Sequence, residues 1–198
     1  MSEVAIIPHA TDEIWTLPSR GVVGMLCLIL AEATIFLIFI VAYVYYIGKS
    51  LSGPTPREVL SLPIFVSICL FSSSATVHFA VAALHKDKHR LCSLWLAATV
   101  ILGGIFLVGT AIEWHHLIYV DGLTISTNLF GTTFYSLVGL HASHVIVGLI
   151  MLVLALIFSL NGSLTSEYVG KLDVLSLYWH FVDAVWVVVF LVVYVFGR

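Results

Sequence analysis

The 198-residue sequence has few charged side chains, and this scarcity excludes most classes of soluble protein. Only 10% of the residues are Asp, Glu, Lys or Arg, whereas 61% are hydrophobic and the mean hydropathy is +1.11. A soluble domain needs about a quarter of its residues charged to cover its surface. The net charge of −3 gives no sign of a nucleic-acid partner. The composition therefore predicts a polytopic membrane protein.

Cysteine and targeting signals are also sparse. The three cysteines, Cys27, Cys69 and Cys92, have no CxxC spacing and lie in or beside apolar runs. We interpret them as small buried hydrophobes rather than disulfide or metal ligands. Residues 1–20 are polar and lack a basic n-region, which predicts a tail with Trp15 as an interfacial anchor rather than a cleavable signal peptide.

Five apolar segments are long enough to cross about 30 Å of hydrocarbon at roughly 1.5 Å per residue. We predict membrane spans at 21–47, 60–84, 91–113, 128–160 and 173–196, and hence one all-α domain over 21–198 with five transmembrane helices. The short link at 85–90 predicts an antiparallel hairpin. Lys and Arg number five on the N-terminal side and three on the other, which favours a cytoplasmic N-terminus and an outside C-terminus.

The last span contains the polar residues that are most costly to insert. His180 and Asp183 follow Trp179 and are three residues apart, so they share one helix face. An Asp at the centre of a span costs roughly 2.5–3.5 kcal/mol on insertion scales, and each Val, Leu or Phe returns only about 0.3–0.6 kcal/mol. Such a pair needs partners inside a protein interior, which points to a larger assembly.

The second span carries a histidine and a run of serines. His78 lies among small residues, where the structural interpretation is an interhelical hydrogen bond. The three serines at 72–74 predict close helix packing or hydroxyl bonds to helix carbonyls.

Two further acids have both a functional and a structural interpretation. Glu32 lies within the first span with no basic residue nearby in sequence. It could serve a proton relay or a lipid headgroup, or it could be a neutral acid bonded to a neighbouring helix, and the sequence favours neither. Glu113 ends the third predicted span and is followed by Trp114, His115 and His116, which are interpreted as interfacial anchors more than as ligands or a proton entry.

The fourth span carries two histidines three residues apart, His141 and His144. Nearby, Gly139 and Ser143 form a small-xxx-small pair that predicts close approach of another helix. Copper or zinc would need further ligands from elsewhere, and a bis-His haem would need His141 and a second histidine such as His180 facing one cavity. Hydrogen-bonded interhelical histidines are the favoured interpretation from spacing alone.

Two long motifs resemble subunit III of the haem–copper terminal oxidases. The segment YWHFVDAVW at 178–186 is similar to that family's signature, and GTTFYSLVGLHASHVIVG at 131–148 carries its paired histidines. Glu32 and Glu113 fall where the family has membrane-embedded acids. The long form of this subunit has seven spans, and this chain resembles the five-span bacterial form.

The resemblance implies an accessory subunit in a bacterial cell membrane. Haem and copper would be held by partner subunits, and this chain would bind neither. Its helices would form a V-shaped bundle with a cleft for structural phospholipid, contact subunit I directly and subunit II within the complex, and support proton uptake and the stability of the catalytic subunit. The residues implied for the lipid cleft or a buried polar network are Glu32, His78, Glu113, His141, His144, Trp179, His180 and Asp183.

Other functions remain open from the sequence. Cytochrome c is the favoured electron donor, quinol is the alternative, and a paralogue that accompanies nitric oxide reductase shares the motifs. A small proton or ion transporter is the candidate from another class. It is disfavoured because no span contains a proline at mid-helix, Pro63 lying in the first turn of its helix.

Overall fold

A computed structural model describes residues 18–197, which contain helices and no strands. The five long helices are α1 (Arg20–Tyr46), α3 (Ile64–Leu84), α4 (His89–Tyr119), α5 (Leu129–Leu160) and α6 (Val169–Phe190), and α6 continues as the π-helical turn η2 (Leu191–Phe196). A short helix α2 (Pro56–Val59) and a 3₁₀ turn η1 (Ser166–Tyr168) lie in the connections. All five long helices have the length and apolar composition to cross a membrane, so the all-α, multi-pass prediction is confirmed.

The predicted spans agree with the helices in number and order but not at every end. Helix α4 runs to Tyr119, six residues beyond the predicted end at Glu113, and α6 begins at Val169 rather than Asp173. Hydropathy finds the apolar part of a helix, whereas backbone hydrogen bonds continue into its polar ends. Trp15 and most of the predicted tail at 1–20 lie outside the described residues.

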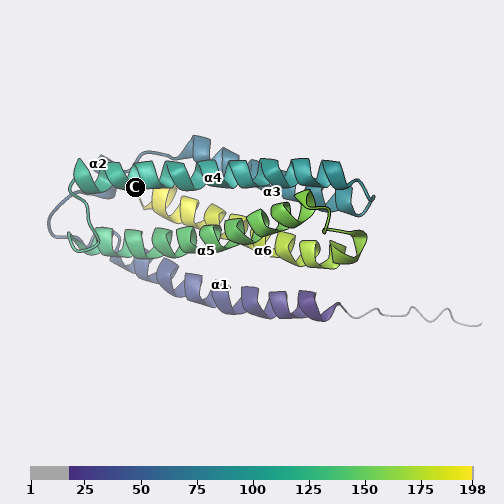
Figure 1. Ribbon diagram of the computed structural model, residues 1–198. Coiled ribbons are helices and arrows are strands. Elements are labelled where there is room, and N and C mark those ends of the chain that lie inside the picture. The colour runs from purple at the N-terminus through teal and green to yellow at the C-terminus, as the bar shows by residue number, and fades with distance from the viewer. Residues whose placement is uncertain (1–17, 198) are drawn as a thin grey trace, which may run out of the picture.

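Helices α3 to α6 form a bundle, and α1 lies on its outside (Figure 1). The tight turn between α3 and α4 places these two helices side by side along most of their length, which confirms the predicted antiparallel hairpin. Helix α6 packs against α3, α5 and α1, whereas α1 packs mainly on α5 and α6. The bundle therefore has α6 at its centre and α1 at its edge.

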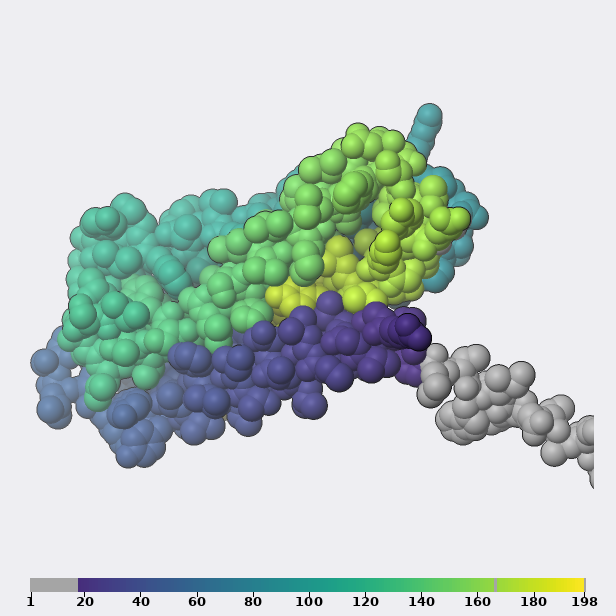
Figure 2. Space-filling view, turned by 60° about the horizontal axis from the view of Figure 1, so that its bottom comes forward, coloured from purple at the N-terminus to yellow at the C-terminus, as the bar shows by residue number. Residues whose placement is uncertain are grey.

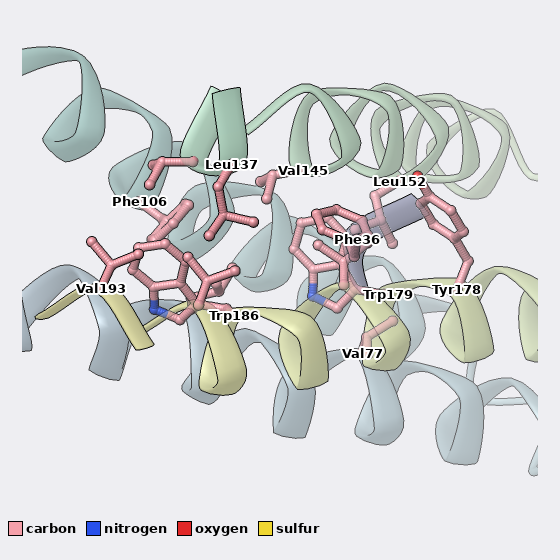
Figure 3. Packing of buried hydrophobic residues seen from close by; sticks show 14 of the residues in the cluster. Phe36, Val77, Phe106, Leu137, Val145, Leu152, Tyr178, Trp179, Trp186 and Val193 are labelled. Atoms are coloured by element: carbon pink, nitrogen blue, oxygen red, sulfur yellow. The ribbon is translucent and has the colours of Figure 1, made fainter. Parts of the chain in front are cut away.

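Two tryptophans of α6 fill the centre of the bundle (Figure 3). Trp179 and Trp186 are buried, and each indole N–H donates to a serine of α3: Trp179 to Ser73 Oγ at 2.9 Å and Trp186 to Ser67 Oγ at 3.0 Å. Buried indoles need such acceptors because an unpaired N–H in an apolar interior is costly. The small hydroxyl residues of α3 thus hold α6 in register.

Glycines make room for Trp179 between α4 and α5. A Cβ added at Gly148 would lie 2.8 Å from the Trp179 ring, and one at Gly103 would lie 3.1 Å from it. A Cβ at Gly139 would make a 3.4 Å contact with Trp114 of α4, so a side chain of another helix lies against this glycine. The contacts at Gly148 and Gly103 are closer, and the spacing of small residues alone does not reveal them.

Helix α1 leaves most of its surface uncovered. Only Phe36 and Tyr43 among its 27 residues are fully buried. The surface is hollowed between α1 and the second half of α5, with α6 at the floor of the hollow (Figure 2). Glu32 of the first span and His144 of the fourth lie at this hollow.

Candidate functional site

The acid of the first span and a histidine of the fourth form one pair. Glu32 Oε2 of α1 lies 3.0 Å from His144 Nε2 of α5. The two side chains are only 24% and 14% exposed. The Phe36 ring packs against the His144 ring at a centroid distance of 4.9 Å, and the Tyr178 hydroxyl donates to the His144 carbonyl. This is the polar link between α1 and the rest of the bundle.

The hydrogen bonds of His144 hold both of its ring nitrogens. Its Nδ1 lies 2.8 Å from the Leu140 carbonyl oxygen, which can only accept, so Nδ1 carries a hydrogen. Its Nε2 is bonded to the Glu32 carboxyl. Within a membrane span this pairing is far less costly than leaving either polar group without a partner.

The Glu32–His144 pair opens onto a groove between α1, α5 and α6. A cavity of about 290 Å³ at this point is lined by Met25 and Leu28 of α1, Val147 and Met151 of α5, and Tyr178 of α6, together with the pair itself. The lining apart from the pair is almost entirely apolar. Such a cavity suits a hydrocarbon chain that has one polar contact.

A second cavity continues the groove toward the end of the bundle where α6 begins. Its volume is about 450 Å³, and it shares Met151 with the first. Its walls are mainly apolar residues of α5 and α6, with Ser163, Leu164 and Tyr168 of the connection between them. Among the described residues that line it, Lys171 is the only charged one. The Lys171 ammonium lies 4.4 Å from the centre of the Tyr168 ring. The two cavities follow α5 from Ser143 to Phe158, about 22 Å at 1.5 Å per residue.

His180 lies on the opposite side of α6, toward α3. Its Nδ1 is 2.6 Å from Ser74 Oγ, and its Nε2 is 3.2 Å from Ser176 Oγ. His78 lines the same groove, which has a volume of about 370 Å³. At the edge of this groove, the exposed His85 Nε2 lies 3.5 Å from Asp173 Oδ1. The histidines of the second and last spans therefore share a site separate from the Glu32–His144 pair.

His141 is enclosed by aromatic rings. It is fully buried, stacks on Trp186 at a centroid distance of 5.0 Å, and meets the edges of Phe106 and Phe36. Neither ring nitrogen has a hydrogen-bond partner among the described residues. His141 and His180 thus lie in different environments and do not face one cavity. Within residues 18–197, no group of three or more His, Cys, Asp or Glu side chains could hold a metal ion.

The two remaining acids lie in separate parts of the bundle. Asp183 is 5% exposed, and neither carboxyl oxygen has a hydrogen-bond partner in the described part of the chain. Glu113 Oε2 accepts a hydrogen bond from the Tyr194 hydroxyl at 3.2 Å, which ties α4 to the end of α6. The polar residues predicted from sequence therefore form several local contacts rather than one connected network.

Several residues that shape these sites carried no functional prediction. Ser67 carried no prediction, and Ser73 was predicted to pack closely or to bond a helix carbonyl. Both accept a tryptophan N–H group. Ser73 also donates to the Leu70 carbonyl at 2.6 Å, as the serine run predicted. Lys171 was predicted only to be one of the positive charges on the N-terminal side of the membrane. Its position at the mouth of an apolar groove depends on the fold of η1 and α6, for which the sequence gives no local signal.

Comparison with known proteins agrees with the motifs in this bundle. The sequence profile of the family described as Cytochrome c oxidase subunit III matches residues 18–198. Cytochrome c oxidase subunit 3 of Alkalihalophilus pseudofirmus is 35% identical, over 84% of this chain and 82% of that protein. The same subunit of Synechocystis is 36% identical, over 89% and 76%. Cytochrome bo(3) ubiquinol oxidase subunit 3 of Pseudomonas aeruginosa is 30% identical, over 96% and 92%.

The relatives include subunits of both cytochrome c and quinol oxidases, so the family is established while the electron donor is not. A subunit III works in a complex with other oxidase subunits, and the five apolar helices place this one in a membrane. The chain is a multi-pass membrane protein that belongs to the cytochrome c oxidase subunit III family of the haem–copper oxidases.

Proposed function

We propose that this chain is the accessory subunit of a proton-pumping oxidase that reduces oxygen to water, and that it binds phospholipid in the groove between α1, α5 and α6. The observation that carries the lipid proposal is the continuity of this groove, from Lys171 at one end to the Glu32–His144 pair at the other. One leaflet of hydrocarbon is about 15 Å thick, so a groove of about 22 Å accommodates an acyl chain from the headgroup level to the bilayer centre.

The chemistry of the two ends supports this orientation of the lipid. The Lys171 ammonium suits a phosphate at the membrane surface, where Tyr168 and Lys171 lie together. The apolar walls suit the chain, and the polar groups of Glu32 and His144 at the inner end are bonded to each other. The V-shaped bundle with a lipid cleft that the family resemblance implies would have its cleft here.

The remaining parts of the proposal concern the assembly. Subunit I is the direct partner, subunit II belongs to the same complex, and haem and copper are bound by those partners. The lipid-filled groove and the buried polar residues stabilise the catalytic subunit and support its proton uptake. We place the N-terminus in the cytoplasm and the C-terminus outside, because Lys and Arg are more numerous on the N-terminal side.

Cytochrome c is the proposed donor, and quinol is the second candidate because a quinol oxidase subunit matches 96% of this chain. Purifying the complex through a tag on this chain, then assaying oxygen consumption with reduced cytochrome c and with a quinol, separates the two. We expect turnover with cytochrome c and a haem spectrum that is absent from this chain once it is separated. A chain that retains its own haem, or purifies without oxidase partners, contradicts the accessory role.

The lipid proposal is tested with Lys171→Gln in the assembled complex. We expect fewer tightly bound phospholipids by mass spectrometry and faster loss of activity during turnover. Lys86→Gln is the matched control, because Lys86 lies in the turn between α3 and α4 and lines neither groove cavity. Equal lipid retention in Lys171→Gln and wild type would overturn this part of the proposal and leave the family assignment intact.

A further inference from the structure

A separate pocket lies at the opposite end of the bundle, where α1 and α6 end and α5 begins. Its volume is about 420 Å³. Aromatic side chains from three helices form much of its wall, and the connection from α1 to α2 forms the rest. This pocket, named here the Arg57 pocket, is lined by Tyr43, Tyr46, Ser50, Arg57, Phe130 and Phe196 among others.

Tyr43 brings an unsatisfied donor to the Arg57 pocket. Its side chain is 1% exposed, yet its hydroxyl has no hydrogen-bond partner among the described residues. Buried hydroxyls are almost always paired, because an unpaired one loses its bonds to water without replacement. A ligand oxygen that accepts from Tyr43 would supply the missing bond.

The described residues that line the pocket include further donors and no acid. Arg57 is exposed and is the only charged residue among them. The next residue, Glu58, turns its carboxylate to the Thr55 N–H at 2.9 Å rather than into the pocket. Ser50 Oγ accepts the Phe130 N–H at 3.1 Å, which leaves its own hydroxyl hydrogen free to donate. The lining therefore favours a ligand with a net negative charge over a zwitterionic one. The cationic group of a zwitterion would lie near Arg57 with no carboxylate to bind it.

These donors lie at two depths. Tyr43 is three residues before Tyr46, about 4.5 Å deeper along α1, whereas Arg57 lies in the connection beyond the end of that helix. A free phosphate would bind the guanidinium and leave the Tyr43 hydroxyl unpaired. A phospholipid has a phosphate at the surface and ester carbonyl oxygens one step deeper, beside its apolar chains.

We propose that the Arg57 pocket binds the headgroup of one anionic phospholipid. Arg57 donates to the phosphate in the paired geometry that guanidinium groups form with phosphates. Tyr43 donates to an ester carbonyl, and Tyr46, Phe130 and Phe196 contact the start of the acyl chains. This site is in the leaflet opposite to that of Lys171, so it does not depend on the groove proposed above.

The test measures lipid retention by the assembled oxidase in nanodiscs of phosphatidylglycerol. Native mass spectrometry counts the phospholipids kept after the discs are exchanged for detergent. We expect Arg57→Gln and Tyr43→Phe each to weaken retention of one lipid by about tenfold, the scale of a lost charge-assisted or buried hydrogen bond. Lys49→Gln is the matched control, because the Lys49 ammonium lies 3.3 Å from the centre of the Tyr45 ring and does not line the pocket.

Three outcomes would overturn the proposal. Unchanged retention in Arg57→Gln would do so, and this variant is expected to assemble because Arg57 is exposed. Displacement of the lipid by excess inorganic phosphate would indicate a site for the free anion alone. Equal retention in discs of phosphatidylcholine would remove the preference for anionic lipid. Lys171→Gln, assayed beside these variants, shows whether the two sites fail separately.

Discussion

Helices α1 and α6 have similar lengths but very different burial. The most apolar part of α1 is 6% buried, against 44% for α6 with η2, although α1 has the higher mean hydropathy, 2.7 compared with 2.1. In a membrane, apolar side chains are as well solvated by lipid as by protein, so hydrophobicity does not draw a helix inward. Small and polar residues place a helix in the interior of the bundle, because they allow close packing and interhelical hydrogen bonds. Helix α6 carries both tryptophan N–H groups that bond to α3.

The comparison assigns the two helices different roles. Helix α6 holds the bundle together, so changes around it should lower stability. Helix α1 is attached by Phe36, Tyr43 and the Glu32–His144 pair, so changes there should alter its docking and the lipid groove more than the fold.

The largest effect is expected where α5 approaches α6. Gly148→Ala would place a Cβ 2.8 Å from the buried Trp179 ring, which has no room to move, so overpacking should cost about 1–3 kcal/mol of unfolding free energy. Thermal unfolding of the complex measures this loss of stability. Gly104→Ala is the control, because nothing lies within 4 Å of a Cβ at that position. Equal stability of the two variants would mean that the bundle is looser than described.

A smaller loss is expected from the hydrogen bond between α6 and α3. Trp179→Phe removes the N–H that donates to Ser73, and bonds between membrane helices contribute about 0.6 kcal/mol on average and up to about 1.7 kcal/mol. Trp95→Phe is the control, since no hydrogen bond of the Trp95 indole is found in the described part of the chain. Denaturation in mixed detergents compares the stability of the two variants. Equal stability would show that the Trp179–Ser73 hydrogen bond does not stabilise the bundle.

Substitutions of Glu32 test how helix α1 docks on the bundle. In Glu32→Gln the side-chain amide can still donate to His144 Nε2, so we expect normal assembly with altered lipid retention or inactivation during turnover. Glu32→Ala removes the bond, at a cost near the average of about 0.6 kcal/mol, and should raise hydrogen exchange in α1. Failure of Glu32→Gln to assemble would show that this carboxyl is required for the fold.

The smallest effect is expected at the connection after α1. The hydrogen bond from the Thr55 backbone N–H lowers the pKa of Glu58 below its ordinary value of 4.5. A lowered pKa stabilises the folded turn above the unfolded value, and this contribution disappears as the pH falls through the folded pKa. Protection of residues 50–60 from hydrogen exchange should therefore decline below about pH 4.5 in wild type. The decline should be absent in Glu58→Gln.

The sequence predicted which side chains are interior better than it predicted their partners. Apolar runs gave the spans, and the insertion cost correctly indicated that Asp183 lies inside. The Glu32–His144 pair joins residues 112 positions apart, so no local pattern could predict it. Lys171 and Arg57 were predicted to lie in connections, and their cavities form only where separate helices come together.

The groove between α1 and the bundle is the central claim about function, and a cryo-electron microscopy map of the native complex tests it most directly. The account predicts density for a phospholipid with its phosphate at Lys171 and its chain reaching the Glu32–His144 pair. A groove filled by a helix of a partner subunit, or closed by movement of α1 onto α5, would contradict the account.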